Sequence, residues 1–289
     1  MPPQLATLIC IVIIVYLFRK DSTRGDGASW SLWIPLVWMF LAGSRSFSQW
    51  MNLRTPDLTS VAEAYMEGSP VDMAVLLLLI IAGLTVLIRR KPDWSAIIKN
   101  NPMIWLFFLF GLISISWSDF PFVSLKRWIK TMGTVIMTLV ILTDKRPYAA
   151  LGLVLRRVTY LTLPLSVLFI RYFPDLGRAY HMGRPSFTGI TFHKNGLGIL
   201  CLTSGIYFCW HFLFKQRTDT DPGSRLHYSI YLLIVPMIVW LFYMANSATS
   251  LACMFAAICL LLIGRLPRME QQPSTLVAIG IIFLVVFGV

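Results

Sequence analysis

Apolar runs long enough to cross a bilayer recur along the whole chain. A spanning helix needs roughly 20 mostly apolar residues, with about 17 to 25 tolerated. By this measure we count about nine runs and an incomplete tenth. They lie near residues 4–18, 31–44, 72–88, 102–117, 126–143, 150–170, 195–214, 228–244, 247–264 and 274–289. Because helices satisfy their backbone hydrogen bonds internally, the sequence predicts an all-α, polytopic integral membrane helical bundle.

The composition agrees with a membrane protein. Apolar residues make up 57% of the 289 residues and charged residues 13%, outside the usual balance of a soluble protein. The first run follows no basic region and precedes no cleavage pattern, so we expect a retained span. The last run, "STLVAIGIIFLVVFGV", has no polar anchor after it. We therefore expect residues 1–289 to form a single transmembrane domain that is the N-terminal part of a longer protein.

The net charge of +12 indicates membrane topology. The basic residues lie between apolar runs without a nucleic-acid-binding signature, so we expect no nucleic acid partner. Sixteen of the 25 Lys and Arg residues fall in or beside the odd-numbered connections, which predicts that these face the cytoplasm. The N-terminus would then face outward. A further half-crossing segment near residues 31–70 would change that placement.

A metal or redox centre is not expected. The five cysteines lie inside apolar runs and form no CxxC pair. His181 and His193 have no accompanying carboxylate, and His211 and His227 fall near the opposite membrane face.

One group of cations lies on the predicted outer side, in "SWSDFPFVSLKRWIK". Lys126 and Lys130 are four residues apart, which places them on one helix face, with Arg127 adjacent. We expect these residues in the first turns of the fifth span, where a cation opposes both the helix dipole and the positive-inside tendency. A bound anion would relieve both penalties.

A second group lies in the sixth connection, "RYFPDLGRAYHMGRPSFTGITFHKN", with one acid, Asp175. Its basic residues are Arg171, Arg178, His181, Arg184, His193 and Lys194. Lys194 and Asn195 open the seventh span. Gly196 and Gly198 would let a ligand or another helix approach the N–H groups of that helix start. Phosphate oxygens of a lipid phosphate or diphosphate would suit such a site.

A simpler interpretation stands beside each of these assignments. Lys and Arg near span ends commonly extend to lipid headgroups. Arg156 and Arg157 would mark the cytoplasmic entry of the sixth span. Ser247 and Ser250, in "NSATSLA", have no base nearby in sequence and are expected to let helices pack closely.

Three elements in this order resemble a known family: "SWSDFPFVSLKR" (116–127), "GITFHKNGLG" (189–198) and "NSATSLA" (246–252). The pattern is similar to the O-antigen ligase and polysaccharide polymerase superfamily, closest to its exopolysaccharide-production branch, and covers about residues 110–265. The HKN element is the most specific. Lys126 stands where the family often has arginine, and one additional residue precedes Phe192.

The resemblance implies a multi-pass enzyme of the bacterial inner (cytoplasmic) membrane, without a cofactor. Such a metal-independent glycosyltransferase takes saccharide from a polyprenyl-diphosphate-linked oligosaccharide at the outer face. It transfers the saccharide to a sugar hydroxyl of an acceptor glycan or lipid, in exopolysaccharide or O-antigen synthesis. Members are typically longer, and the large periplasmic loop with their main catalytic residues has no counterpart before Val289.

The chemistry implied by the family assigns roles to the cations. A leaving diphosphate gathers negative charge that positioned cations stabilise. The expected diphosphate ligands are Lys194, Arg184, Arg178, Lys126, Arg127 and Lys130. His193 or His181 would accept the proton of the acceptor hydroxyl, although the His193 ring could equally bond a loop carbonyl and hold its turn. Asn195 is expected to cap the seventh helix, with Gly196 and Gly198 as structural residues.

Two rival hypotheses remain. A transporter or flippase of lipid-linked saccharide would use ionisable residues near the bilayer midplane and commonly has internal repeats, whereas here the charges lie at span ends. The chain could also be an inactive truncated remnant, because it stops before the family's catalytic loop.

Overall fold

The computed structural model describes residues 1–22, 29–51, 69–181, 184–215 and 228–265, with Ser274 and Ala278 beyond them. Within this part, the side chains of Ser22, His181, Arg184 and Lys215 are not described. Contacts divide the chain into two compact units: unit 1 comprises Met1–Asp26 with Leu155–Val289, and unit 2 comprises Gly27–Val154. The boundary falls inside one helix, and each unit is described by itself.

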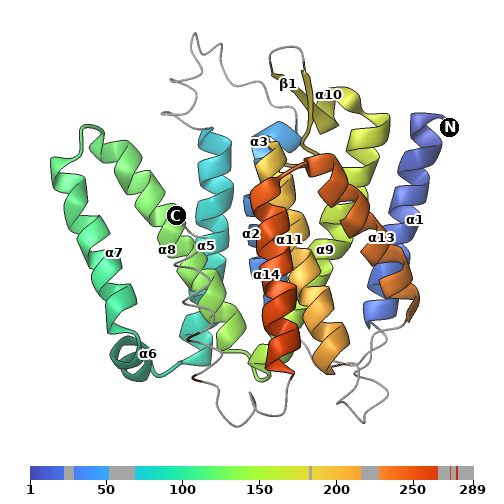
Figure 1. The fold of residues 1–289 in the computed structure, drawn as a ribbon. Coiled ribbons are helices and arrows are strands. Elements are labelled where there is room, and N and C mark those ends of the chain that lie inside the picture. The colour runs from blue at the N-terminus through green and yellow to red at the C-terminus, as the bar shows by residue number, and fades with distance from the viewer. Residues whose placement is uncertain are drawn as a thin grey trace. The chain divides into compact units, whose positions relative to one another are not determined.

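Unit 1 is a bundle of long helices with one small hairpin (Figure 1). Helix α11 packs against both α13 and α14, and the shared core includes Leu17, Tyr160, Leu197 and Leu241. The elements of the unit are α1 (Pro3–Ser22), most of α9 (Pro147–Tyr172), α10 (Pro174–Gly177), β1 (Arg178–His181), β2 (Arg184–Phe187), α11 (Lys194–Trp210), the π-helical turn η3 (His211–Lys215), α13 (Tyr228–Ala245) and α14 (Ala248–Gly264).

Unit 2 is built around helices α5 and α8, which pack against each other and against α2. Its core includes Trp38, Leu87, Met137 and Val140. The elements are η1 (Trp30–Leu32), α2 (Trp33–Gly43), α3 (Phe47–Trp50), α5 (Pro70–Arg90), α6 (Trp94–Asn100), α7 (Pro102–Ser114), η2 (Ile115–Trp117), α8 (Pro121–Leu142) and the start of α9.

Proline sets the starts of several helices. Pro70, Pro102 and Pro121 each occupy the first turn of their helix, and α9 begins at Pro147. Proline is favoured there because its fixed φ suits a helix and its missing N–H would be unpaired in that turn in any case. These positions explain why helix α8 begins before the apolar run that predicts it.

The predicted membrane bundle is confirmed in its class. Each of the nine complete runs falls on helix, and five described helices are long and apolar enough to cross a membrane, or six if α6 and α7 form one bent span. Two predicted spans form shorter helices, Trp30–Gly43 and Ala248–Gly264. Helix α8 carries three cations in its first half. The count of nine crossings is not confirmed and, like the orientation, stays a prediction.

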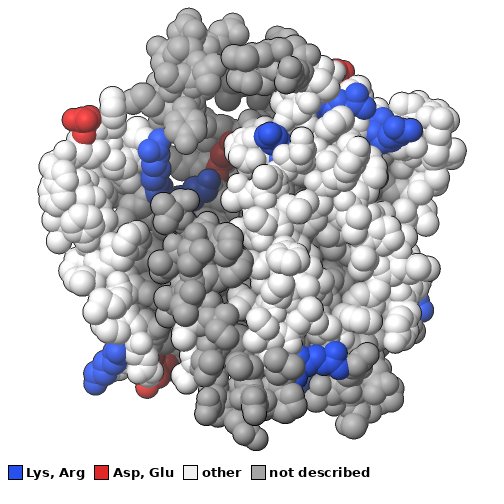
Figure 2. Space-filling model, viewed as in Figure 1, with Lys and Arg blue, Asp and Glu red and all other residues white. Residues whose placement is uncertain are grey.

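The surface of α14 fits a lipid environment. In the view of Figure 2, the surface over α14 shows no charged side chain between the two ends of the helix. The tenth predicted run, 274–289, lies outside the described residues except for Ser274 and Ala278, as does most of the connection 51–70.

Buried ion pairs hold helices together within each unit. In unit 1, Asp21 accepts hydrogen bonds from Nε of Arg156 and from Nε of Arg157, the latter at 2.7 Å. In unit 2, Arg90 donates to Asp144 Oδ2 at 2.7 Å. The two arginines of α9 therefore do more than mark the entry of a span, because they fasten it to α1.

Candidate functional site

The sixth connection contains a short β-hairpin. β1 pairs antiparallel with β2, with Arg178 opposite Phe187 and His181 opposite Arg184 in the register. The hairpin is the one strand pairing within the described residues and leaves the all-α class unchanged.

Gly177 anchors the base of this hairpin. Its carbonyl accepts hydrogen bonds from the N–H groups of Thr188 and Gly189, at 2.9 and 3.1 Å. A Cβ at Gly177 would lie 2.3 Å from the carbonyl carbon of Phe169. Only glycine allows α10 to lie this close to the backbone of α9.

Thr191 holds the turn that precedes α11. Its hydroxyl lies 2.7 Å from the carbonyl of Thr188 and 3.0 Å from that of His193, and its N–H donates to Thr188 at 3.1 Å. Gly189 has a φ of +60°, which a residue with a side chain rarely adopts. Within the described residues, this bracing comes from Thr191 and no bond of the His193 ring contributes to it.

His193 occupies the N-cap position of α11, and its side chain makes no capping hydrogen bond. Lys194 is the first helical residue and Asn195 the second, and all three side chains are exposed. The prediction that Asn195 caps the helix is therefore wrong, since a cap must precede the first helical turn. The start of α11 presents a cation and N–H groups that no side chain of the described residues caps.

The two glycines in the first turns of this helix serve packing. A Cβ at Gly198 would lie 2.5 Å from Ser250 Oγ and 3.0 Å from Ser247 Cβ, so α14 crosses α11 at this point. A Cβ at Gly196 would meet the side chain of Thr191 at 3.1 Å. Of the two alternatives predicted for these glycines, close approach of another helix is confirmed for Gly198. The expected packing role of the serines is confirmed by the same contact.

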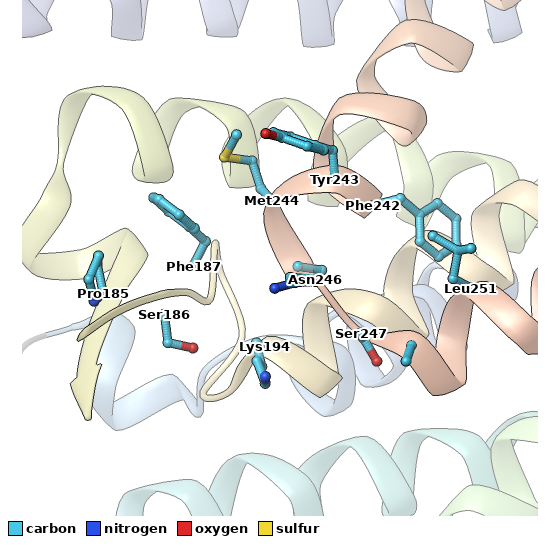
Figure 3. Close-up of a pocket in the computed structure, with 12 residues that line it drawn as sticks. Pro185, Ser186, Phe187, Lys194, Phe242, Tyr243, Met244, Asn246, Ser247 and Leu251 are labelled. Carbon is cyan, nitrogen blue, oxygen red and sulfur yellow. The ribbon is translucent and has the colours of Figure 1, made fainter. Parts of the chain in front are cut away.

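A pocket of about 920 Å³ opens beside the start of α11. Figure 3 shows Lys194 between Ser186 of β2 and Ser247, the residue before α14, with Asn246 facing the same space. The remaining lining comes from the hairpin, the last turn of α13 and the first turn of α14: Pro185, Phe187, Phe242, Tyr243, Met244, Ala245, Ala248 and Leu251. The pocket therefore joins the "FHKN" and "NSATSLA" elements, far apart in the sequence, at one end of unit 1.

Asn246 and Ser186 are site residues that sequence reasoning missed. Asn246 links α13 to α14 in the left-handed conformation, with φ of 43°, which asparagine tolerates better than most residues. The one available signal was its place at the head of "NSATSLA", where the serines suggested only packing.

Arg178 has a structural task within unit 1. Its Nε and Nη2 donate to the carbonyl of Ile170 at 3.2 and 3.0 Å, and its guanidinium lies 5.5 Å from the ring centroid of Phe187. It ties the hairpin to the end of α9, where a cation also suits the helix dipole. For His181 and Arg184 the structure gives the backbone register alone.

Lys126, Arg127 and Lys130 belong to unit 2, so the structure does not place them against the pocket of unit 1. All three are exposed. Helix α8 begins at Pro121, which makes Lys126 its sixth residue and Lys130 its tenth. Lys126 and Arg127 therefore lie in the second turn of α8 and Lys130 in the third. The expected dipole penalty is small for them, because the dipole acts mainly within the first turn.

Among the described residues, no group of three His, Cys, Asp or Glu side chains is placed to hold a metal ion. Comparisons of the chain with protein-family models, with curated proteins and with solved structures gave no match. What the structure defines is the class, a helical membrane protein with an open pocket at one end of a bundle.

The contact between α11 and α14 makes a direct prediction. Gly198→Ala is expected to lower the free energy of unfolding by about 1–3 kcal/mol, because the new methyl group overlaps Ser250. Unfolding in detergent, followed by circular dichroism, measures the loss. Ser250→Ala removes the nearest atom, so the double variant should recover part of the lost stability. Ser250→Ala alone is the control. Additive losses would contradict the contact.

Proposed function

We propose that the protein is a membrane glycosyltransferase of the O-antigen ligase and polysaccharide polymerase type, acting in exopolysaccharide or O-antigen synthesis. Its donor would be a polyprenyl-diphosphate-linked oligosaccharide and its acceptor a sugar hydroxyl on a glycan or lipid. The observation that carries this proposal is the meeting of Lys194, at the uncapped start of α11, with Asn246 and Ser247 in one open pocket.

Charge and shape support a diphosphate at this pocket. The start of α11 adds the positive end of the helix dipole to the charge of Lys194, and both are unfavourable together unless an anion is near. Apolar lining from Phe242, Met244 and Leu251 lies beside these polar groups, which suits a lipid-linked saccharide with a polar head and an apolar chain. The location would be the outer face of a bacterial inner membrane.

The residues divide the reaction between them. The acceptor hydroxyl oxygen would attack the anomeric carbon as the bond from that carbon to the diphosphate breaks, and the electron pair leaves with the polyprenyl diphosphate. Lys194 would stabilise the charge that gathers there, with Arg184 as a further ligand from the hairpin. His193 would take the hydroxyl proton, since it directly precedes Lys194 and its exposed side chain makes no capping hydrogen bond. His181 is the other candidate base.

Paired variants at the start of α11 test the proposal. Lys194→Ala is expected to weaken binding of a polyprenyl-diphosphate-linked saccharide about tenfold or more, because a hydrogen bond to a charged group is lost. His193→Ala should retain binding and lower transfer about a hundredfold or more. Purified protein in nanodiscs would be assayed for binding and for glycan product. Arg265→Ala is the matched control, because Arg265 is an exposed cation that follows the far end of α14.

Unchanged binding in Lys194→Ala would remove the diphosphate from this pocket. Unchanged transfer in His193→Ala would remove this histidine from the chemistry.

A transporter or flippase of the same lipid-linked saccharide is the second candidate. The buried cluster of Asp21, Arg156 and Arg157 favours it, because ionisable residues enclosed among membrane helices often mark transport pathways. Movement of the labelled lipid-linked saccharide across vesicles, without any transfer product, would place this function first.

A further inference from the structure

A second pocket lies in unit 2, between α7 and α8. It encloses about 580 Å³ and is lined almost wholly by apolar side chains. Figure 1 shows α7 and α8 close together at one end and diverging towards α6. The lining residues are Ile98, Lys99, Pro102, Trp105, Leu106, Phe108, Leu109, Leu112, Trp128 and Met132. From Pro102 to Leu112 the groove follows α7 for about 15 Å.

The end of this groove is shaped by a sharp bend. Helix α6 is turned by 89° from the helix that starts at Pro102, and the side chain of Asp93 caps α6 by accepting from the N–H of Ala96 at 3.1 Å. With α7 directed across the bilayer, a helix turned by this angle would lie along the membrane surface. Trp94 and Lys99 on α6 have the amphipathic character of that depth.

Two polar groups stand out in the apolar lining. Lys99, at the α6 end, is exposed and is the one charged residue among the lining residues. The indole Nε1 of Trp105 is buried and has no hydrogen-bond partner among the described residues. The indole of Trp128, by contrast, donates to the carbonyl of Phe108 at 3.0 Å. A buried N–H donor without a partner is costly, and a ligand oxygen would satisfy it.

We propose that this groove is a binding site for one anionic glycerophospholipid. An acyl chain would lie along α7, with the phosphate near Lys99 and an ester or phosphate oxygen accepting from the Trp105 indole. The charge of the adjoining connection selects an anionic headgroup. The segment 89–101 contains one acid, Asp93, and three cations besides Arg90: Arg89, Lys91 and Lys99. Arg90 is paired with Asp144. On the predicted orientation this end faces the cytoplasmic leaflet, which is rich in anionic lipid.

Native mass spectrometry of the full chain, released from micelles titrated with phosphatidylglycerol, tests the site. One tightly retained phosphatidylglycerol is expected, in preference to phosphatidylcholine with the same acyl chains. Lys99→Ala should weaken retention about fivefold, the change expected for one cation near an anionic headgroup. Trp105→Phe keeps the ring without the N–H and should weaken it a few-fold.

Two further variants complete the design. Leu109→Trp fills the groove and should abolish retention of both lipids; Leu109 is 53% exposed, so the larger ring fits without repacking the core. Lys145→Ala, an exposed cation of unit 2 outside the groove, should change nothing. Equal retention of the two headgroups, or preferential retention of a polyprenyl phosphate, would overturn the assignment. Circular dichroism of each variant separates loss of binding from loss of fold.

Discussion

Replacing Asp21 by asparagine is expected to lower the free energy of unfolding by about 3–5 kcal/mol. The carboxylate accepts from Arg156 and Arg157, and the side chains are 0%, 5% and 15% exposed respectively. Arg156 also lies with its Nη1 3.5 Å from the hydroxyl of Tyr207. Among the described residues, Asp21 is the acid that pairs with both arginines. Its replacement by a neutral amide removes a buried charge that compensates two enclosed guanidinium groups, and breaking a buried ion pair in this way is strongly destabilising.

Equilibrium unfolding in detergent measures this loss. Asp119→Asn is the matched control, because Asp119 is exposed. Arg157→Gln in the Asp21→Asn background should recover part of the stability, since it removes one of the two guanidinium charges that Asp21 pairs with. A loss below about 1 kcal/mol, the usual worth of a surface pair, would show that the cluster is solvated instead of buried.

Replacing Gly177 by alanine is expected to cost about 3 kcal/mol and to open the pocket beside α11. The new Cβ would lie 2.3 Å from the carbonyl carbon and 2.4 Å from the oxygen of Phe169. These are backbone atoms of α9, so no side-chain rotation relieves the overlap. The carbonyl of Gly177 would shift with it and loosen its bonds to Thr188 and Gly189.

The readouts for this variant are unfolding and donor binding together. Gly43→Ala is the control, because no atom lies within 4 Å of the Cβ it would add. We expect Gly177→Ala to weaken binding of the polyprenyl-diphosphate-linked saccharide although Lys194 is intact, since Ser186 and Phe187 of the hairpin wall the pocket. Stability equal to that of Gly43→Ala would contradict the role of Gly177 as the anchor of the hairpin.

Much of the helical framework follows from local rules. The thickness of a bilayer sets the length of an apolar run, so every complete predicted run falls on helix. The start of α8 differs because Pro121 and the polar "SLKR" segment are helical without being apolar. A first-turn proline is the signal that would have placed that start correctly.

Local rules predicted less of the candidate site. "FHKNGLG" could be placed at a helix start because the apolar run begins there, and Lys194 is the first residue of α11. In the structure His193, and not Asn195, is the N-cap residue of α11, and Arg178 donates to a backbone carbonyl of α9. Neither role was predictable, because both depend on where neighbouring backbone atoms lie. The hairpin was not predictable, because strands of four residues are too short to show an alternation of polar and apolar residues in the sequence.

By itself, the sequence determined the membrane class, the positions of the helices and the cation at the start of α11, because hydrophobicity and helix length act within one segment. Only the tertiary structure decided that Asp21 pairs with arginines 135 and 136 residues away and that Lys194 shares a pocket with Asn246. The physical reason is that a pair of polar side chains inside a bundle is selected by which helix faces pack together. In this chain glycines such as Gly198 set how closely those faces approach.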